Sequence, residues 1–242
     1  MVERTIIGEG KTAKVYLENG FAYKVFNENH PIDWIEYEVH IQNEIEQHTK
    51  LPVLSYTLNK SEREIRMPYI KGIELTERIL KEKYKNGLED LITLQLSVYK
   101  YQNLNLPNGH LVFLKHFQHS KIPDEYRNIG IEYLNAIPYQ PTLCHFDMHF
   151  SNILYDGNYT IIDWVNAKLA NPILDVARSF VILRQYAYRL SSKYLRIMMK
   201  KMDFSEIEMN KAIVVMAILR IIEVEQSEID VLRKIINEFQ IA

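Results

Sequence analysis

The stretch LCHFDMHFSNILYDGNYTIIDW, residues 143–164, combines chemically active side chains with the apolar residues of a protein interior. Four of these side chains, His145, Asp147, Asn152 and Asp163, can exchange protons or bind a cation. A charged group is costly to bury unless it is paired or coordinates a metal. The stretch therefore predicts a functional site built into the core of the fold.

The second half of the stretch predicts a β-hairpin. NILY and TIID have strand character, and Asp156-Gly157-Asn158 between them suits a turn. Such a hairpin brings Asn152 and Asp163 together at its open end. Their amide and carboxylate oxygens suit Mg²⁺, which takes few protein ligands and completes its shell with water and phosphate oxygens. Asp147, in the loop just before this hairpin, is free to accept a proton from a substrate hydroxyl.

The composition is that of an ordinary globular protein. Its 242 residues are 47% hydrophobic and 25% charged, which allows one large domain or two lobes. A net charge of -2 does not predict attraction to nucleic acid or to an acidic membrane. The longest apolar run, Ala212–Leu219, is far shorter than the roughly 20 residues that cross a bilayer. We therefore expect neither nucleic acid nor membrane as a partner.

Cysteine usage and the N-terminal sequence predict a cytoplasmic location. The one cysteine, Cys144, cannot form an internal disulfide, and its apolar neighbours favour the role of a small buried hydrophobe over that of a nucleophile. The segment MVERTIIGEG has neither the basic start nor the apolar centre of a signal peptide.

The first seventy residues predict strands around one helix. VYLE and FAYKVF flank Asn19-Gly20, which suits a tight hairpin. Pro31 favours a helix start, and the helical periodicity that follows predicts a helix over 31–48. VLSYTL and EIRMPYI then predict two further strands.

Beyond Gly72 the pattern becomes helical. The predicted helices lie near 74–84, 88–101, 123–136, 171–200 and 205–239. We therefore place a lobe boundary near residue 71, with a small β-rich lobe over 1–70 and a larger, mainly helical lobe over 71–242. The expected fold is α+β and bilobal. No flexible linker separates the lobes, so a shared cleft is expected.

The loop from His145 to Asn152 resembles that of the aminoglycoside phosphotransferase and choline kinase families, which carry H-x-D-x-H-x-x-N followed by I-D-W. The resemblance implies the protein-kinase-like fold, with Asp147 as catalytic base. It also implies that Asn152 and Asp163 hold the magnesium ions that bridge the phosphates of ATP. The families anchor this loop with an aspartate that corresponds to Asp175 in ANPILDVA.

The residues IIGEGKTAKVY resemble the glycine-rich loop of the same fold. Gly8 and Gly10 lie between two predicted strands, Ala13 stands where protein kinases have a third glycine, and Lys24 lies in the second strand of the hairpin. By this resemblance Lys24 reaches the α- and β-phosphates. A dinucleotide-binding fold also uses G-x-G-x-x-A, but there the motif opens a helix. Here it leads into a hairpin, which argues against that interpretation.

Glu38 is the candidate partner of Lys24. It shares a helical face with Trp34, Ile41 and Ile45, and a carboxylate on an apolar face is costly unless it meets a cation. Kinases orient the phosphate-binding lysine with a glutamate from the helix of the small lobe, so we expect a Lys24–Glu38 pair.

The segment EIRMPYIKG resembles the connection between the two lobes, where backbone groups hydrogen-bond adenine. Met67, Tyr69 and Ile70 are the resulting nucleotide-binding candidates.

These features predict a small-molecule kinase. Protein kinases hold a peptide with a long segment after the metal-binding aspartate, whereas only Trp164–Ala170 separate Asp163 from Asn171 here. The expected reaction transfers the γ-phosphate of ATP or GTP, with Mg²⁺, to a hydroxyl of a small acceptor such as an aminoglycoside, a choline-like amine alcohol or a sugar. The alternative is a pseudokinase-like nucleotide-binding module that acts through partner binding.

Other charged and polar residues have simpler interpretations. His145 is expected to brace the loop, and a zinc pair with His149 is disfavoured because it lacks a third ligand. A run of basic residues is expected to be the solvated side of helices, with an anion site as the less favoured alternative: Arg178, Arg184, Arg189, Lys193, Arg196, Lys200 and Lys201. An acidic group is either a solvated helix end or an attractor of a cationic substrate: Glu223, Glu225, Glu228 and Asp230.

Overall fold

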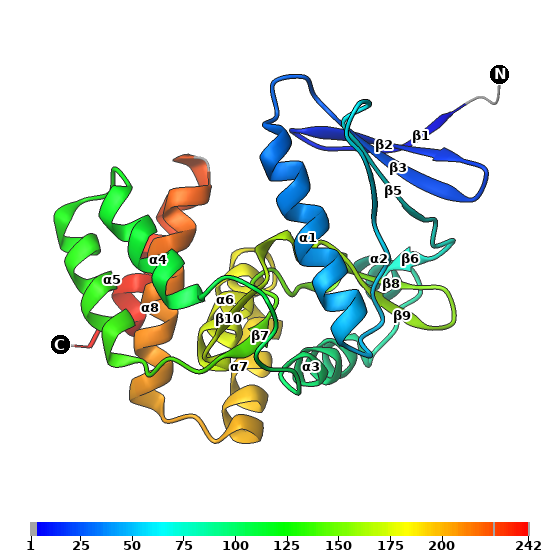
Figure 1. The fold of residues 1–242 in the computed structure, drawn as a ribbon. Coiled ribbons are helices and arrows are strands. Elements are labelled where there is room, and N and C mark those ends of the chain that lie inside the picture. Colours follow the sequence, from blue (N-terminus) through cyan, green and yellow to red (C-terminus); the bar gives the residue numbers. More distant parts are fainter. Residues whose placement is uncertain (1–3, 225, 242) are drawn as a thin grey trace. The chain divides into compact units, whose positions relative to one another are not determined.

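A computed structural model of the chain describes residues 4–224 and 226–241, which form two compact units (Figure 1). The first unit comprises the chain up to Lys83 together with Ser151–Val165. The second comprises Tyr84–Phe150 and the chain from Asn166 onward. The first unit thus runs past the boundary placed near residue 71 and also includes the hairpin formed by residues 153–161. The lobe boundary itself stays a prediction.

An antiparallel sheet of five strands forms most of the first unit, in the order β1-β2-β3-β5-β4. Its strands are β1 (Thr5–Glu9), β2 (Ala13–Glu18), β3 (Phe21–Phe26), β4 (Thr57–Asn59) and β5 (Glu64–Pro68). The β2–β3 hairpin turns at Asn19 and Gly20, which have positive φ angles of 48° and 80°. This is the turn that the Asn-Gly pair predicted.

Helix α1 (Ile32–His48) lies beside this sheet (Figure 1). Ile35 and Val39 of the helix form a buried cluster with Phe26 and Ile65 of the strands. Ile41 and Ile45 are fully buried, as the helical periodicity predicted. Trp34 shares their face but lies in the first turn and is 63% exposed, so this face is not covered along its whole length.

A second, three-stranded sheet completes the first unit, in the order β6-β8-β9. It contains β6 (Ile73–Glu74), β8 (Ile153–Tyr155) and β9 (Tyr159–Ile161), and helix α2 (Leu75–Lys81) follows β6 directly. The β8–β9 turn contains Gly157 with φ of 116°. The predicted hairpin is therefore present.

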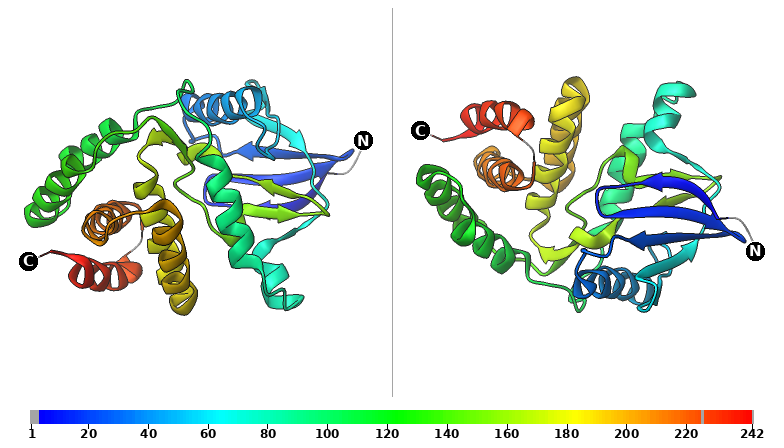
Figure 2. Two further views of the ribbon diagram at one scale, coloured as in Figure 1. Left: turned by 90° about the horizontal axis from the view of Figure 1, so that it is seen from below. Right: turned by 90° about the horizontal axis from the view of Figure 1, so that it is seen from above.

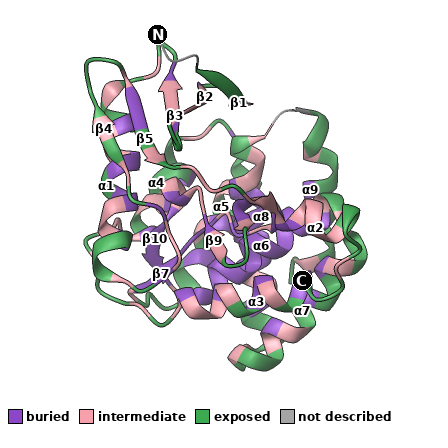
Figure 3. Ribbon diagram, turned by 90° about the vertical axis from the view of Figure 1, so that its right-hand side faces the viewer, coloured by how far each residue is buried: buried purple, intermediate pink, exposed green. Residues whose placement is uncertain are grey.

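Helices dominate the second unit. They are α3 (Gly87–Val98), α4 (Gly109–His119), α5 (Asp124–Ala136), α6 (Pro172–Tyr186), α7 (Tyr188–Met202), α8 (Glu206–Glu223) and α9 (Ile229–Phe239). Figure 2 shows α4 and α5 side by side, and α8 packs against α5, α6 and α9. Figure 3 shows that α6 and α8 are largely buried. The apolar run Ala212–Leu219 is thus core, and none of the described helices has the length and apolar character that a bilayer crossing needs.

Several elements differ from the prediction. The segment 171–200 is two helices, because Ala187 leaves helical geometry with φ of -138° and ψ of 56°. The segment 205–239 is also divided, since α8 ends before the extended residue Val224. Helix α4 and the paired short strands β7 (Thr142–Cys144) and β10 (Lys168–Ala170) were not predicted. Three-residue strands are too short to show an alternating pattern.

Candidate active site

Lys24 and Glu38 form an ion pair inside the first unit. Lys24 is on β3 between the buried residues Ala22 and Phe26, and Glu38 is on the inner face of α1. The Lys24 Nζ lies 2.7 Å from Glu38 Oε1. The Glu38 side chain is only 9% exposed. The pair expected from the sequence is therefore present and holds the lysine at a fixed position.

A cavity of about 300 Å³ opens beside this pair, and its lining lies entirely in the first unit. Apolar side chains such as Val15, Ala22 and Leu154 form much of its wall. Six candidate site residues line the same cavity: Lys24, Met67, Tyr69, Ile70, Asn152 and Asp163. The structure thus gathers residues from four separate segments of the sequence around one space.

The two glycines of IIGEGKTAKVY are not among the residues that line this cavity. Gly8 pairs with Val15 across a bulge in the β1–β2 ladder. The Gly10 N–H donates to the Ala13 carbonyl oxygen at 2.9 Å and closes the turn. Each could carry a Cβ at ordinary contact distance, 3.6 Å or more from the nearest atom. Local packing therefore does not require glycine here, and the role of both in holding a nucleotide stays a prediction.

The β8–β9 hairpin places Asn152 and Asp163 at its open end, as expected. Ile153 pairs with Ile161, and the Ile162 N–H donates to the Asn152 carbonyl oxygen at 3.0 Å. Asp163 follows with a positive φ of 63°, a conformation that is strained for a residue with a side chain. The hairpin ladder and this backbone conformation together fix the point at which the Asp163 side chain leaves the main chain.

The oxygen donors of this hairpin fit a magnesium ion. In residues 4–224 and 226–241, no three His, Cys, Asp or Glu side chains form a metal-binding group. The available donors are one carboxylate, from Asp163, and the amide oxygen of Asn152, whose side chain lines the same cavity. Mg²⁺ keeps several waters and binds through one or two protein ligands plus phosphate oxygens, so a small set of hard donors suits it.

Tyr56 was missed by the sequence analysis. It lines the same cavity, and burial is the main reason that its pKa is raised far above its ordinary value. The negative charges of Glu38 and Asp163 raise this pKa further, which shows that both carboxylates act on one hydroxyl. No sequence motif marks Tyr56, because it approaches the site only through the fold of the loop after α1.

The candidate catalytic loop, from His145 to Phe150, lies in the second unit. His145 is fully buried, and its Nδ1 accepts the Asp147 N–H at 3.2 Å, as expected of a bracing residue. Phe146 has a positive φ of 60°, which turns the chain sharply before Asp147. The Asp147 side chain is 20% exposed, and its Oδ2 lies 3.9 Å from His149 Nε2. The loop therefore presents one partly exposed carboxylate from a rigid base.

Asp175 anchors this loop from helix α6. Its Oδ1 accepts the Phe146 N–H at 2.6 Å, and its Oδ2 accepts from Gln95 Nε2 at 2.9 Å and from the Tyr99 hydroxyl at 2.7 Å. Tyr194 in turn donates to Gln95 Oε1 at 2.6 Å. Because Asp175 is fully buried, these charge-assisted bonds hold the strained Phe146 peptide firmly.

Tyr186, at the end of α6, is a second residue that the sequence analysis missed. Burial and, next, the charge of Asp147 raise the pKa of Tyr186 to about 12, and the backbone of Phe150 opposes this with a hydrogen bond. The charge of Asp147 therefore acts on this hydroxyl, which stays protonated at neutral pH, while the residue as a whole is 56% exposed.

The interpretation of the basic run needs correction at two residues. Arg178 and Arg184 are buried and form ion pairs with Glu223 and Glu238, so they are not on a solvated face. Glu223 pairs with arginines of its own unit, and Glu225 lies outside the described residues.

Cys144 is fully buried, as expected. Burial raises its pKa well above the ordinary thiol value, which keeps the thiol protonated.

Comparisons with known proteins agree with this geometry. Residues 103–194 match the family model described as "Phosphotransferase enzyme family". Among solved structures, aminoglycoside phosphotransferase APH(4)-Ia is similar with a TM-score of 0.72 and 10% identity, covering 98% of this chain and 92% of that chain. A choline/ethanolamine kinase family protein from Mesorhizobium loti is similar with a TM-score of 0.66 and 13% identity, covering 98% and 87%. No protein with a curated function matches the sequence.

Choline kinase LicA from Streptococcus pneumoniae is also similar, with a TM-score of 0.60 and 13% identity over 98% of this chain and 94% of that chain. The chain therefore has the protein-kinase-like fold, and its residues 103–194 are similar to a phosphotransferase family. The resemblance to the aminoglycoside phosphotransferase and choline kinase families, inferred from the catalytic-loop residues, is confirmed.

Proposed function

We propose that the protein transfers the γ-phosphate of ATP or GTP to a hydroxyl of a small acceptor, with Asp147 as the catalytic base. The observation that carries this proposal is the cavity of the first unit. It combines an apolar wall with a lysine held by a buried carboxylate and two hard oxygen donors. The apolar wall suits the nucleobase, the lysine suits the triphosphate, and the oxygen donors suit its cation.

The nucleotide is assigned by complementarity to the cavity. The Lys24 ammonium, 2.7 Å from Glu38, donates to oxygens of the α- and β-phosphates. The adenine lies along Met67, Tyr69 and Ile70, and since the Tyr69 N–H already donates to the Gly20 carbonyl, recognition falls on the peptide of Ile70. Similar solved structures include APH(4)-Ia in a ternary complex with AMP-PNP and hygromycin B, and APH(2'')-Ib bound to ADP.

The chemical step is assigned to Asp147, Asn152 and Asp163. Asn152 and Asp163 would hold a magnesium ion, which would neutralise charge on the phosphate oxygens. Asp147 accepts the hydrogen bond of the acceptor hydroxyl, orients its oxygen toward the γ-phosphorus and takes the proton as the new bond forms. Only four residues separate Asp147 from Asn152 in the sequence, and the Asp175 anchor stiffens the loop before them.

The proposal is tested by following ADP or GDP release from the purified protein with Mg²⁺, either nucleotide, and a panel of aminoglycosides, amine alcohols, sugars and hydroxy acids. Acceptor-dependent release that is lost without Mg²⁺ supports the proposal. Nucleotide binding that needs no Mg²⁺, without transfer to any acceptor, contradicts it and favours the partner-binding module. A matched Asp147→Asn sample identifies any release due to contaminating kinases.

A further inference from the structure

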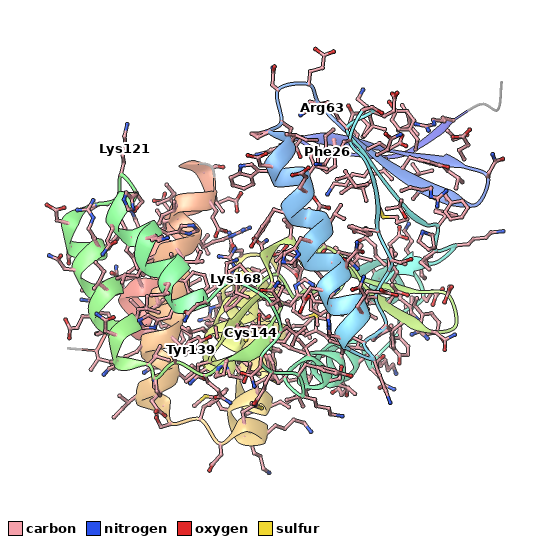
Figure 4. All side chains as sticks on the ribbon, viewed as in Figure 1. Phe26, Arg63, Lys121, Tyr139, Cys144 and Lys168 are labelled. Atoms are coloured by element: carbon pink, nitrogen blue, oxygen red, sulfur yellow. The ribbon has the colours of Figure 1, made fainter. Side chains whose placement is uncertain are left out.

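A small pocket in the second unit contains two buried cations. Its volume is about 40 Å³, and it lies among α4, the catalytic loop, β10, α6 and α8. Lys168, labelled in Figure 4, is 9% exposed, and Arg178 is 5% exposed. Since a cavity needs about 10–15 Å³ for each water, this space fits a group of three or four heavy atoms. Sequence analysis assigned no role to Lys168, and it favoured a solvated helix face over an anion site for Arg178.

Lys168 has no carboxylate partner in the described part of the chain. Its ammonium donates to the Asn166 carbonyl oxygen at 2.7 Å. It also lies 5.9 Å from the ring centre of Phe113 and 5.8 Å from that of Phe146, within the range of cation–π attraction. One carbonyl and two ring faces do not neutralise a buried charge, and two of its three N–H donors are left for a ligand.

The one carboxylate of the pocket is already engaged. Glu223 forms ion pairs with Arg178 and with Arg220, the latter at 3.3 Å, and its side chain is 42% exposed. Two guanidinium groups thus share a single carboxylate at the rim. The charged side chains that line the pocket, Lys168, Arg178 and Glu223, therefore sum to a net positive charge.

We propose that this pocket binds an oxyanion, a carboxylate or phosphate group, carried by the acceptor, so that the acceptor is an anionic hydroxyl compound. The inference rests on the proposed function. Phe146, which lines the pocket, directly precedes Asp147, and Arg178 Nε donates to the Phe146 carbonyl oxygen at 3.3 Å. An acceptor anchored by its oxyanion here presents a hydroxyl a few atoms away to Asp147.

The pKa shifts of the basic residues around the pocket agree with this assignment. Burial lowers the pKa of Lys168 to about 8; nearby Glu223 raises it and Arg178 lowers it further. Burial and then the charge of Lys168 lower the pKa of His116, which lines the same pocket. A bound oxyanion offsets the cost of burying the Lys168 charge and its repulsion with Arg178 and His116. An aminoglycoside or choline would instead add a further positive charge beside these residues.

The binding test uses inorganic phosphate as probe, measured by calorimetry on nucleotide-free protein. Wild type binds with a saturable Kd, and Lys168→Met weakens binding about tenfold or more because a charge-assisted contact is lost. Phosphate could also bind in the nucleotide cavity, which Lys24 lines. Binding that persists in Lys24→Met therefore assigns the phosphate to the pocket of Lys168. Lys193→Met is the matched control, because Lys193 pairs with Glu89 on the surface. Binding lost only in Lys24→Met, or unchanged in Lys168→Met, overturns the inference.

The kinetic test compares acceptors with and without an oxyanion on a similar polyol skeleton: gluconate against sorbitol, and glycerate or glycerol phosphate against glycerol. Wild type prefers the anionic member of each pair, and the carboxylate and phosphate arms distinguish the two oxyanions. Lys168→Met raises KM for the anionic acceptor about tenfold with little change in kcat. Transfer to neutral or cationic acceptors that Lys168→Met does not affect overturns the inference and leaves the proposed phosphotransfer standing.

The variant also reports whether Lys168 is merely structural. Replacing an unneutralised buried cation with a similar apolar chain is expected to keep or raise the melting temperature at neutral pH. A large loss of stability in Lys168→Met contradicts the inference, and Lys168→Gln, which keeps a donor without charge, then separates loss of charge from loss of packing. Phosphate binding is measured without nucleotide, so the pocket is decided even if no acceptor is phosphorylated.

Discussion

Lys24 and Lys168 are both lysines on short strands beside a cavity, yet their surroundings differ. Lys24 has Glu38 at 2.7 Å, and its charge is matched before any ligand arrives. Lys168 has a carbonyl oxygen and two aromatic rings. The first cavity, of about 300 Å³, has space for a nucleotide, and the second, of about 40 Å³, has space for one small group.

This difference indicates how the two sites select their ligands. A nucleotide carries its own cation and many polar atoms, so a lysine that is already held in place contributes position more than net charge. In the second pocket the unmatched charge itself discriminates, because only an anion compensates it. The first site therefore depends on preorganisation and the second on charge.

The largest expected effect separates binding from chemistry. Asp147→Asn should lower kcat about a thousandfold, because the amide cannot accept the proton of the acceptor hydroxyl. Nucleotide affinity and phosphate affinity should both stay within about twofold, since neither cavity is lined by Asp147. Rapid-quench turnover and calorimetry measure the two quantities.

Asp156→Asn in the β8–β9 turn is the matched control, because Asp156 caps the turn by accepting the Asn158 N–H. Turnover of Asp147→Asn close to that of Asp156→Asn would remove the catalytic assignment.

The same two lysines show what the sequence could reveal. Lys24 was found because a hairpin, a helical face and a family motif all lie within forty residues, so local patterns define its surroundings. The β8–β9 hairpin was predictable for the same reason. Lys168 was not found, because Phe113, Phe146 and Arg178 approach it only when distant helices pack together. The run of basic residues predicted a solvated face for Arg178, whereas the tertiary structure shows that Arg178 is buried.

Position within an element limited prediction in a second way. Trp34 has the correct helical phase for burial, but a phase does not show how far the covering sheet extends along the helix. Tyr56 and Tyr186 similarly follow no motif, and each is recognised by the carboxylate that acts on its hydroxyl. Periodicity therefore predicted the elements of the first unit better than the contacts between them.

The next effect, on stability, tests whether the charge of Lys168 is truly unmatched. The folded chain loses the Lys168 proton near pH 8, whereas the unfolded chain keeps it to about pH 10.5. Between these values the unfolded state binds more protons, so the stability contributed by this residue rises with pH. Below pH 8 the buried positive charge of Lys168 lowers the free energy of unfolding by its full amount. Urea unfolding measures the free energy of unfolding of wild type and of Lys168→Met. The difference between these two free energies should change by about 3 kcal/mol from pH 8 to about pH 10.5. Parallel pH profiles for the two proteins would contradict the unmatched charge.

A smaller effect tests the matched lysine. Glu38→Gln removes the charge that holds Lys24, so KM for ATP should rise about tenfold while the overall fold persists. Glu36→Gln is the control, because Glu36 lies on the same helix but pairs with Lys60 on the surface. Steady-state kinetics at saturating acceptor provide the measurement, and equal KM values for the two variants would show that Lys24 does not depend on its partner.

The smallest effect comes from making the second pocket more positive. Glu223→Gln removes the carboxylate that Arg178 and Arg220 share, and phosphate affinity should increase about threefold, because the side chain is partly exposed and its charge is screened. Arg178 keeps its bond to the Phe146 carbonyl oxygen, so the pocket retains its shape. Glu238→Gln is the matched control, since Glu238 pairs with Arg184 on the same helix but does not line the pocket. Weaker phosphate binding in Glu223→Gln would mean that the glutamate orients Arg178 for the ligand, as Glu38 orients Lys24, and the contrast between the two lysines would then be one of degree.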